Sequence, residues 1–89
     1  MQTLKEKRTQ IDTINGQLMA LLGQRLQIAR EIAKIKKRGG LPILDETRED
    51  AIKEKVRKQA REQGLSAPVM EEIFQILLDY TRMEMEAVE

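Results

Sequence analysis

The sequence contains no cysteine and no histidine among its 89 residues. Without cysteine, disulfide scaffolds, thiolate metal sites and cysteine nucleophiles are excluded. Without histidine, Ser-His-Asp catalysis and nearly all zinc catalysis are excluded as well. We therefore expect neither a metal nor a cofactor, and any chemistry must use the remaining charged and hydroxyl side chains.

Aromatic residues, net charge and long apolar runs are also scarce. Phe74 and Tyr80 are the only aromatic residues, which leaves no stacking surface for single-stranded nucleic acid. Lys and Arg number 16 against 15 Asp and Glu, so the net charge of +1 provides no concentrated basic surface for nucleic acid or an anionic membrane. No run of 18 apolar residues occurs, and the polar start does not resemble a signal peptide, so we expect a cytoplasmic protein.

The residues that are present favour an all-α fold. Ala, Leu, Ile, Glu, Lys, Arg and Gln dominate the composition, as is typical of helices. Glycines at 39, 40 and 64 provide helix ends, while Asp45 and Ser66 are suitable N-caps. We expect one domain, residues 1–89, with three helices over about residues 2–38, 45–62 and 67–88.

An apolar stripe at heptad spacing follows the first helix. Steps of three and four separate its members within two groups, and Leu4 is in phase one heptad before the first: Ile11, Ile14, Leu18 and Leu21, and then Ile28, Ile32 and Ile35. The phase continues through Asn15-Gly16, normally a turn signal, so we expect one unbroken helix. Such a helix is about 55 Å long, whereas a compact chain of this size is about 30 Å across. Its far half must be covered by another chain or left bare.

Gly16, Ala20 and Gly23 form a line of small residues in the same helix. They either let another helix approach closely or are glycines tolerated on a surface, at a cost of about 1 kcal/mol each. The sequence leaves both interpretations open.

Arg25 interrupts the apolar stripe between Leu21 and Ile28. An unpaired guanidinium in a core costs several kcal/mol unless an anion meets it. Arg25 therefore has two interpretations. It is either a structural residue, which sets the helix register or extends its charge to the solvent at an edge, or part of an anion-binding site. Lys36 favours the anion site, because it lies eleven residues on, within about 20° of the same face and about 16 Å along the axis.

Arg8 lies about 25 Å from Arg25 along the same helix, too far to join it within one chain. In a symmetric antiparallel pair of helices that cross near residue 20, Arg8 of one chain lies level with residue 32 of the other. It is then between Arg25 and Lys36. Such a dimer has two equivalent sites, each with a cation from the partner.

Polar residues of the other two helices are candidates for the same site. Arg48 and Glu49 border the sparse apolar stripe of the second helix. They are either a solvated edge of that helix or part of the same pocket. In the pocket, Arg48 would supply a cation, Glu49 an acceptor and Asp45 an ordered helix start. Thr81 lies on the inward face of the third helix and either offers its hydroxyl or bonds back to its own helix. This set suits binding of a small dicarboxylate, or a reaction that needs restraint and charge stabilisation without proton transfer.

The charged residues belong to a pattern that covers nearly the whole chain without gaps. It runs from Arg8 through Leu21-Leu22-Gly23-Gln24-Arg25 and Lys36 to Gly40-Leu41-Pro42-Ile43-Leu44-Asp45-x-x-Arg48-Glu49, and ends with Phe74-Gln75-x-Leu77-Leu78. This pattern resembles that of the all-helical (AroQ-type) chorismate mutases. The combination of spaced Arg, Lys and Arg-Glu is specific, although each piece alone is weak.

The resemblance implies an intertwined homodimeric helical bundle that converts chorismate to prephenate on the route to Phe and Tyr. The reaction is a unimolecular Claisen rearrangement, so it needs no covalent catalyst. By the same resemblance, Arg25 and Arg8 of the partner subunit would hold the two substrate carboxylates. Lys36 would contact the ether oxygen, where negative charge develops, and a carboxylate as well.

The resemblance also assigns roles to residues of the second and third helices. Glu49 would accept from the ring hydroxyl, supported by Arg48 and the Asp45 region, and Thr81 would contact a carboxylate directly or through water. Met85 departs from the pattern, since the family usually has Gln or Glu there to donate to the ether oxygen. Because loss of such a donor commonly costs a factor on the order of 10²–10³, reduced activity is expected.

Two other functions remain open. Isochorismate pyruvate lyases share the architecture and a similar cationic pocket, although the segment Asp45-x-x-Arg48-Glu49 looks more like a mutase. Alternatively, the chain is a non-catalytic helical dimerisation or regulatory module, which the heptads support and Met85 mildly favours.

Overall fold

The computed structural model describes residues 2–89 and contains the expected all-α fold. Its helices are α1 (Leu4–Arg38), α2 (Glu46–Glu62) and α3 (Ala67–Glu86). Helix α1 begins two residues later than predicted and α3 ends two residues earlier, because Thr3 is the N-cap of α1 and Ala87 the C-cap of α3. Within the described range there is no strand.

Local capping explains where α1 begins and ends. Thr3 accepts from the backbone N–H of Glu6, and the Glu6 carboxylate accepts from the backbone N–H of Thr3, which is a capping box. At the other end Gly40 has a φ of +66°, and the N–H of Leu41 donates to the carbonyl of Lys36 at 2.8 Å. This is a Schellman motif. The helix continues through Gly16 without a break, as the apolar phase predicted.

The ends of α2 and α3 follow the same rules. Asp45 caps α2 by accepting from the backbone N–H of Arg48 at 3.0 Å, and Ser66 caps α3 by accepting from that of Val69 at 3.4 Å. Gly64, with a φ of +71°, ends α2 in the left-handed conformation. These short connections bring α3 back along α2.

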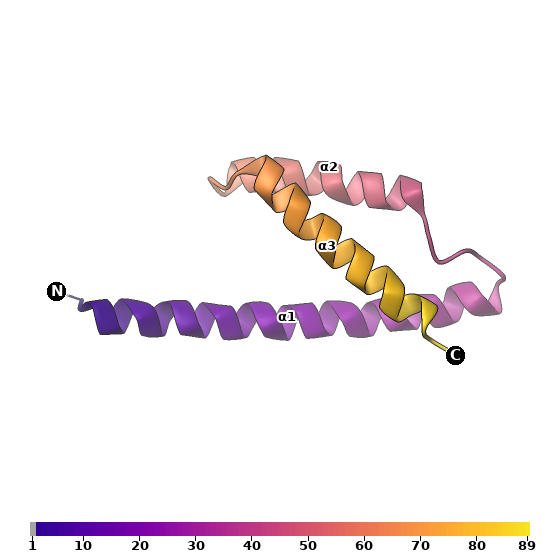
Figure 1. Cartoon of the computed structure of the whole chain (residues 1–89), viewed down its shortest axis with the longest axis horizontal. Coiled ribbons are helices and arrows are strands. Elements are labelled where there is room, and N and C mark those ends of the chain that lie inside the picture. Colours follow the sequence, from indigo (N-terminus) through magenta and orange to yellow (C-terminus); the bar gives the residue numbers. More distant parts are fainter. Residues whose placement is uncertain (1) are drawn as a thin grey trace.

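Helix α3 crosses between the other two helices and packs against both (Figure 1). In residues 2–89, no Cα atom of α1 lies within 8 Å of one in α2. The molecule measures 58 × 26 × 15 Å and has a radius of gyration of 16.4 Å, compared with about 12 Å for a compact chain of this length. The expectation that the first helix is longer than its domain is thus confirmed.

The buried core lies at the C-terminal end of α1. Ala29, Ala33 and Met85 are buried together, with Ile43 and Val88 packed against them. Lys37 secures this end, because its ammonium donates to the backbone carbonyls of Glu86, the last residue of α3, and of Val88 after it. The core is small because alanines supply most of its α1 side.

The N-terminal part of α1 extends past the other two helices (Figure 1). Its apolar stripe has no cover within the chain, and Leu18, for example, is 54% exposed. The other large exposed members in this part are Leu4, Ile11, Ile14 and Leu21. No helix in residues 2–89 combines the length and apolarity needed to cross a membrane.

Candidate functional site

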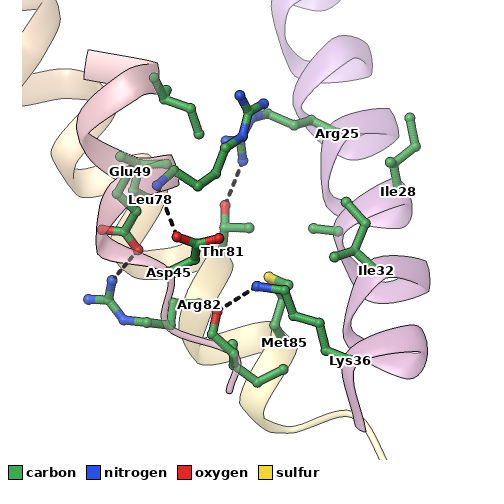
Figure 2. Close-up of a pocket in the computed structure, with 14 residues that line it drawn as sticks. Arg25, Ile28, Ile32, Lys36, Asp45, Glu49, Leu78, Thr81, Arg82 and Met85 are labelled. Carbon is green, nitrogen blue, oxygen red and sulfur yellow. Dashed lines mark hydrogen bonds and ion pairs between the residues drawn. The ribbon is translucent and has the colours of Figure 1, made fainter. Parts of the chain in front are cut away.

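A cavity of about 270 Å³ lies between α1 and α2, with α3 as its floor (Figure 2). This volume is near the lower end for small-molecule sites. Six of its lining side chains are charged, four cations against two carboxylates, so the pocket has a net charge of +2. The charged side chains are Arg25, Lys36, Asp45, Arg48, Glu49 and Arg82. The remaining lining residues are Thr81, Met85 and the apolar Ile28, Ala29, Ile32, Ile43, Ile52 and Leu78.

Arg25 points from α1 into this pocket and contacts α3. Its Nη1 donates to Oγ1 of Thr81 at 2.8 Å (Figure 2). The Thr81 hydroxyl in turn donates to the backbone carbonyl of Leu77 at 2.6 Å. Of the two predicted possibilities for Thr81, the bond back to its own helix is therefore the one observed, and its oxygen fixes the guanidinium of Arg25.

Burial and a neighbouring charge affect Arg25. Desolvation lowers the pKa of Arg25 below its ordinary value, and the positive charge of Arg48 lowers it further. Both effects reflect a cation that is partly removed from water and faces another cation. An anionic ligand between Arg25 and Arg48 would relieve this repulsion.

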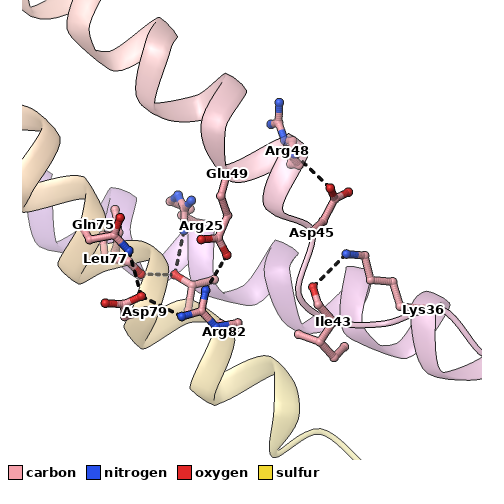
Figure 3. A network of polar contacts seen from close by, with 11 residues as sticks. Arg25, Lys36, Ile43, Asp45, Arg48, Glu49, Gln75, Leu77, Asp79 and Arg82 are labelled. Atoms are coloured by element: carbon pink, nitrogen blue, oxygen red, sulfur yellow. Dashed lines mark hydrogen bonds and ion pairs between the residues drawn. The ribbon is translucent and has the colours of Figure 1, made fainter.

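Lys36 reaches the opposite end of the same cavity. Its ammonium donates to the backbone carbonyl of Ile43 at 3.1 Å, in the connection between α1 and α2 (Figure 3). An ammonium has three donors, so this bond positions Lys36 and leaves it able to donate to a ligand. The sequence contains no signal for the Ile43 carbonyl, because a backbone group in a loop has no residue-type signature.

The start of α2 brings three predicted residues to the pocket: Asp45, Arg48 and Glu49. Asp45 has a structural task as N-cap and also lines the cavity. Glu49 is the less exposed partner of an ion pair, with its side chain 18% exposed. Glu49 is thus partly buried at the pocket, whereas Arg48 lines the pocket and is still exposed, as a solvated edge would be.

Sequence reasoning missed Arg82. This residue lines the pocket from α3 and donates to Oε2 of Glu49 at 2.6 Å and to Oδ1 of Asp79 at 2.8 Å (Figure 3). The hydrogen bond to Glu49, joined by the one to Asp79, raises the pKa of Arg82 above its ordinary value. The available signal was spacing, since Arg82 follows Leu78 by four residues and precedes Met85 by three, in line with the apolar face of α3.

Met85 lines the cavity and is also part of the core, with only 9% of its surface exposed. Its carboxylate neighbour Glu84 is bound to Arg30 at 3.4 Å and is not among the residues lining the cavity. A methionine, which cannot donate a hydrogen bond, therefore lines the cavity at the position where the resemblance implies a donor.

Arg8 is the one predicted site residue that lies away from this cavity. It is exposed on the N-terminal part of α1 and does not line the pocket. This agrees with the geometric expectation that Arg8 cannot meet Arg25 within one chain. The described pocket can thus hold a small dianion between Arg25, Lys36 and Arg48, and can stabilise developing negative charge without a titrating acid or base.

The sequence of this chain is similar to those of known proteins. The model of the family described as chorismate mutase type II matches residues 7–86. A chorismate mutase of Methanocaldococcus jannaschii is 33% identical over 82 residues, which cover 92% of this chain and 83% of that protein. A T-protein of Haemophilus influenzae is 34% identical over 73 residues, 82% of this chain but 19% of its own length. A bifunctional chorismate mutase/prephenate dehydratase of Aquifex aeolicus is 39% identical over 62 residues, 70% of this chain and 17% of its own length.

Proposed function

Because this chain belongs to the chorismate mutase type II family, we propose that its cationic pocket binds chorismate and rearranges it to prephenate. The chain is accordingly an isomerase, a chorismate mutase of aromatic amino-acid biosynthesis. The observation that carries the assignment to this pocket is the convergence of Arg25 and Lys36, from one helix, on a cavity with net charge +2. Chorismate has two carboxylates, so its charge matches that of the pocket.

The reaction breaks the ether C–O bond and forms a C–C bond within one molecule. No proton is transferred and no group leaves, so the protein contributes restraint and electrostatic stabilisation. Arg25 holds one carboxylate in a fixed direction, because Thr81 anchors its guanidinium. Lys36 donates to the ether oxygen, and the Ile43 carbonyl keeps its ammonium in place.

The hydroxyl of the substrate ring lies at the α2 side in this proposal. Glu49 accepts its hydrogen, and Arg48 contributes a further cation from the adjacent position. Asp45 orders the first turn of α2, on which both residues lie. Thr81 acts chiefly through Arg25, because its own hydrogen is directed at the Leu77 carbonyl.

We further propose that the active molecule is an antiparallel, intertwined homodimer. The uncovered stripe of α1 supports it, because contiguous apolar surface of this kind needs a partner. A second copy that crosses near residue 20 covers the stripe. It also places Arg8 of the partner subunit level with residue 32, between Arg25 and Lys36. The partner's Arg8 then holds the second carboxylate.

A product assay tests the function. The protein is supplied with chorismate and, separately, with isochorismate, and the products are identified. We expect prephenate from chorismate, and we expect Arg25→Ala to abolish its formation while the protein stays folded. Pyruvate and salicylate from isochorismate would show that the chain is a lyase. If neither chorismate nor isochorismate is converted, the non-catalytic dimerisation module is the remaining function.

Complementation tests the shared site. Arg8→Ala and Arg25→Ala proteins, each inactive, are mixed, unfolded and refolded together. A mixed dimer has one site with both arginines intact, so about a quarter of the wild-type activity should return. No recovery would mean that Arg8 and Arg25 do not meet across the interface.

A further inference from the structure

Arg82 lies at the wall of the pocket and binds two carboxylates from different helices. One is Glu49 of α2 at 2.6 Å and the other is Asp79 of α3 at 2.8 Å (Figure 3). The Arg82 side chain is 29% exposed, so the pair with Glu49 is partly shielded from water. Arg82 therefore links α2 to α3 beside the proposed substrate site.

The direction from which Arg82 approaches is informative. Figure 2 places its guanidinium on the outer side of the Glu49 carboxylate, away from Arg25 and Lys36. A separate hollow on the α2–α3 surface is also lined by Glu49 and Arg82, together with Asp50 and Lys53 of α2. The ion pair uses Oε2 of Glu49, one of its two oxygens.

We propose that Arg82 is a positioning residue: it holds Glu49 by one oxygen so that the other accepts the ring hydroxyl of the substrate. This inference rests on the proposed function, because it takes Glu49 as the acceptor. It adds to that function a residue which touches no substrate atom.

Electrostatics explain why Glu49 needs such a partner. Arg25, Lys36 and Arg48 line the same cavity, and each attracts a carboxylate. An unrestrained glutamate would turn toward one of them, because its side chain has several rotatable bonds. It would then neutralise a cation that the carboxylates of the substrate require. Arg82 provides a competing cation on the outer side and keeps Glu49 apart from the others.

Arg82 is itself fixed. Asp79 accepts from Nη2 of Arg82 and also from Nε2 of Gln75 at 3.0 Å. A chain of hydrogen bonds thus runs along α3 from Gln75 through Asp79 to Arg82 and ends at Glu49 on α2. Such a network restricts the rotamers of each member.

Arg82→Met tests the role, with Arg57→Met as a matched control. Arg57 of α2 binds Glu71 of α3 at 2.7 Å, so it also joins these helices, but it does not line the pocket. Steady-state kinetics with chorismate and thermal unfolding are measured for both variants. We expect KM to rise about tenfold in Arg82→Met, as for a misplaced charged hydrogen bond, with a smaller change in kcat. Arg57→Met should stay within about twofold, and Arg82→Lys should recover part of the loss.

A double-mutant cycle separates positioning from a general structural effect. In a Glu49→Gln background, Arg82→Met should change KM by less than about twofold, because a residue that acts through Glu49 then has no carboxylate to hold. Additive effects, or an equal loss in Arg57→Met, would overturn the proposal. If Arg82→Met does not fold, Arg82→Gln, which also removes the charge, gives the same two outcomes in the same cycle.

The wild-type protein distinguishes this inference from the proposed function. If it forms no prephenate, the function itself is wrong. If it turns over chorismate and Arg82→Met has the wild-type KM, only the role of Arg82 is wrong.

Discussion

Arg25 and Thr81 meet at 2.8 Å across the contact between α1 and α3, although they lie 56 positions apart in the sequence. The contact fixes a cation that the apolar stripe of α1 would otherwise exclude. Thr81 accepts from Arg25 and donates to Leu77, so the backbone of α3 determines the direction of the guanidinium. A hydroxyl that is hydrogen-bonded to its own helix thereby also orients a charge on another helix.

Thr81→Val should weaken substrate binding. Valine has the same shape but no acceptor, so Arg25 loses its anchor while the packing of α3 is retained. We expect KM for chorismate to rise about five- to tenfold, which corresponds to about 1 kcal/mol, the typical net contribution of one hydrogen bond. Thr81→Ser, which keeps the oxygen, is the control and should stay within about twofold. Equal effects of the two substitutions would contradict the anchoring role.

Lys36→Met should lower kcat more than it raises KM. The ether oxygen gains charge only as the C–O bond breaks, so its donor acts mainly on the transition state. A loss on the order of 10²–10³ in kcat is expected, from single-turnover measurements with saturating chorismate. Lys34→Met is the control, because Lys34 is exposed and does not line the cavity. A pure KM effect would place Lys36 on a carboxylate instead.

Met85→Gln should raise turnover and reduce stability. An amide at this position supplies a second donor to the ether oxygen, which is expected to raise kcat by about tenfold or more. The residue is 9% exposed, so an amide without a ligand is poorly satisfied, and the free energy of unfolding should fall by about 1–3 kcal/mol. Met83→Gln, at a site 71% exposed, should change neither quantity. Unchanged or lower turnover in Met85→Gln would show that this position does not face the ether oxygen.

Gly16→Ala should stabilise the protein. Apart from its two neighbours and the nearby backbone of its own helix, nothing lies within 4 Å of the position that a Cβ at Gly16 would occupy. The residue is about 160° around the helix from Leu18 of the apolar stripe. Alanine should therefore add about 1 kcal/mol to the free energy of unfolding, measured by urea titration at one fixed protein concentration. Gly40→Ala is the opposite control, since φ at Gly40 is +66° and alanine is strained there. Destabilisation by Gly16→Ala would mean that another helix approaches this face.

Local chemistry explains why so much of the fold was predictable. The ends of α1, α2 and α3 depend on residues within a few positions, such as Thr3, Asp45 and Gly64. The positions of Arg25 and Lys36 follow from helical periodicity alone, once α1 is continuous. The expected ends differ from the observed ones by two positions at the start of α1 and at the end of α3, and by one at the start of α2.

The parts of the site that escaped prediction depend on how the helices meet. Arg82 reaches Glu49 only because α3 lies against α2 at one angle, and no pattern within either helix specifies that angle. The bond from Lys36 to the Ile43 carbonyl depends on a loop conformation. The direction of the Thr81 hydroxyl depends on its rotamer. The contribution of Arg8 stays a prediction, because it requires a second chain.

The bond between Lys36 and the Ile43 carbonyl has a consequence for sequence length. Surface connections usually tolerate insertions, because nothing depends on the orientation of their peptide groups. One residue inserted between Gly40 and Asp45 would rotate the Ile43 peptide and leave the ammonium without its acceptor. We therefore expect this connection to act as a spacer of fixed size, and natural variation in length to fall in the turn at residues 63–66 instead.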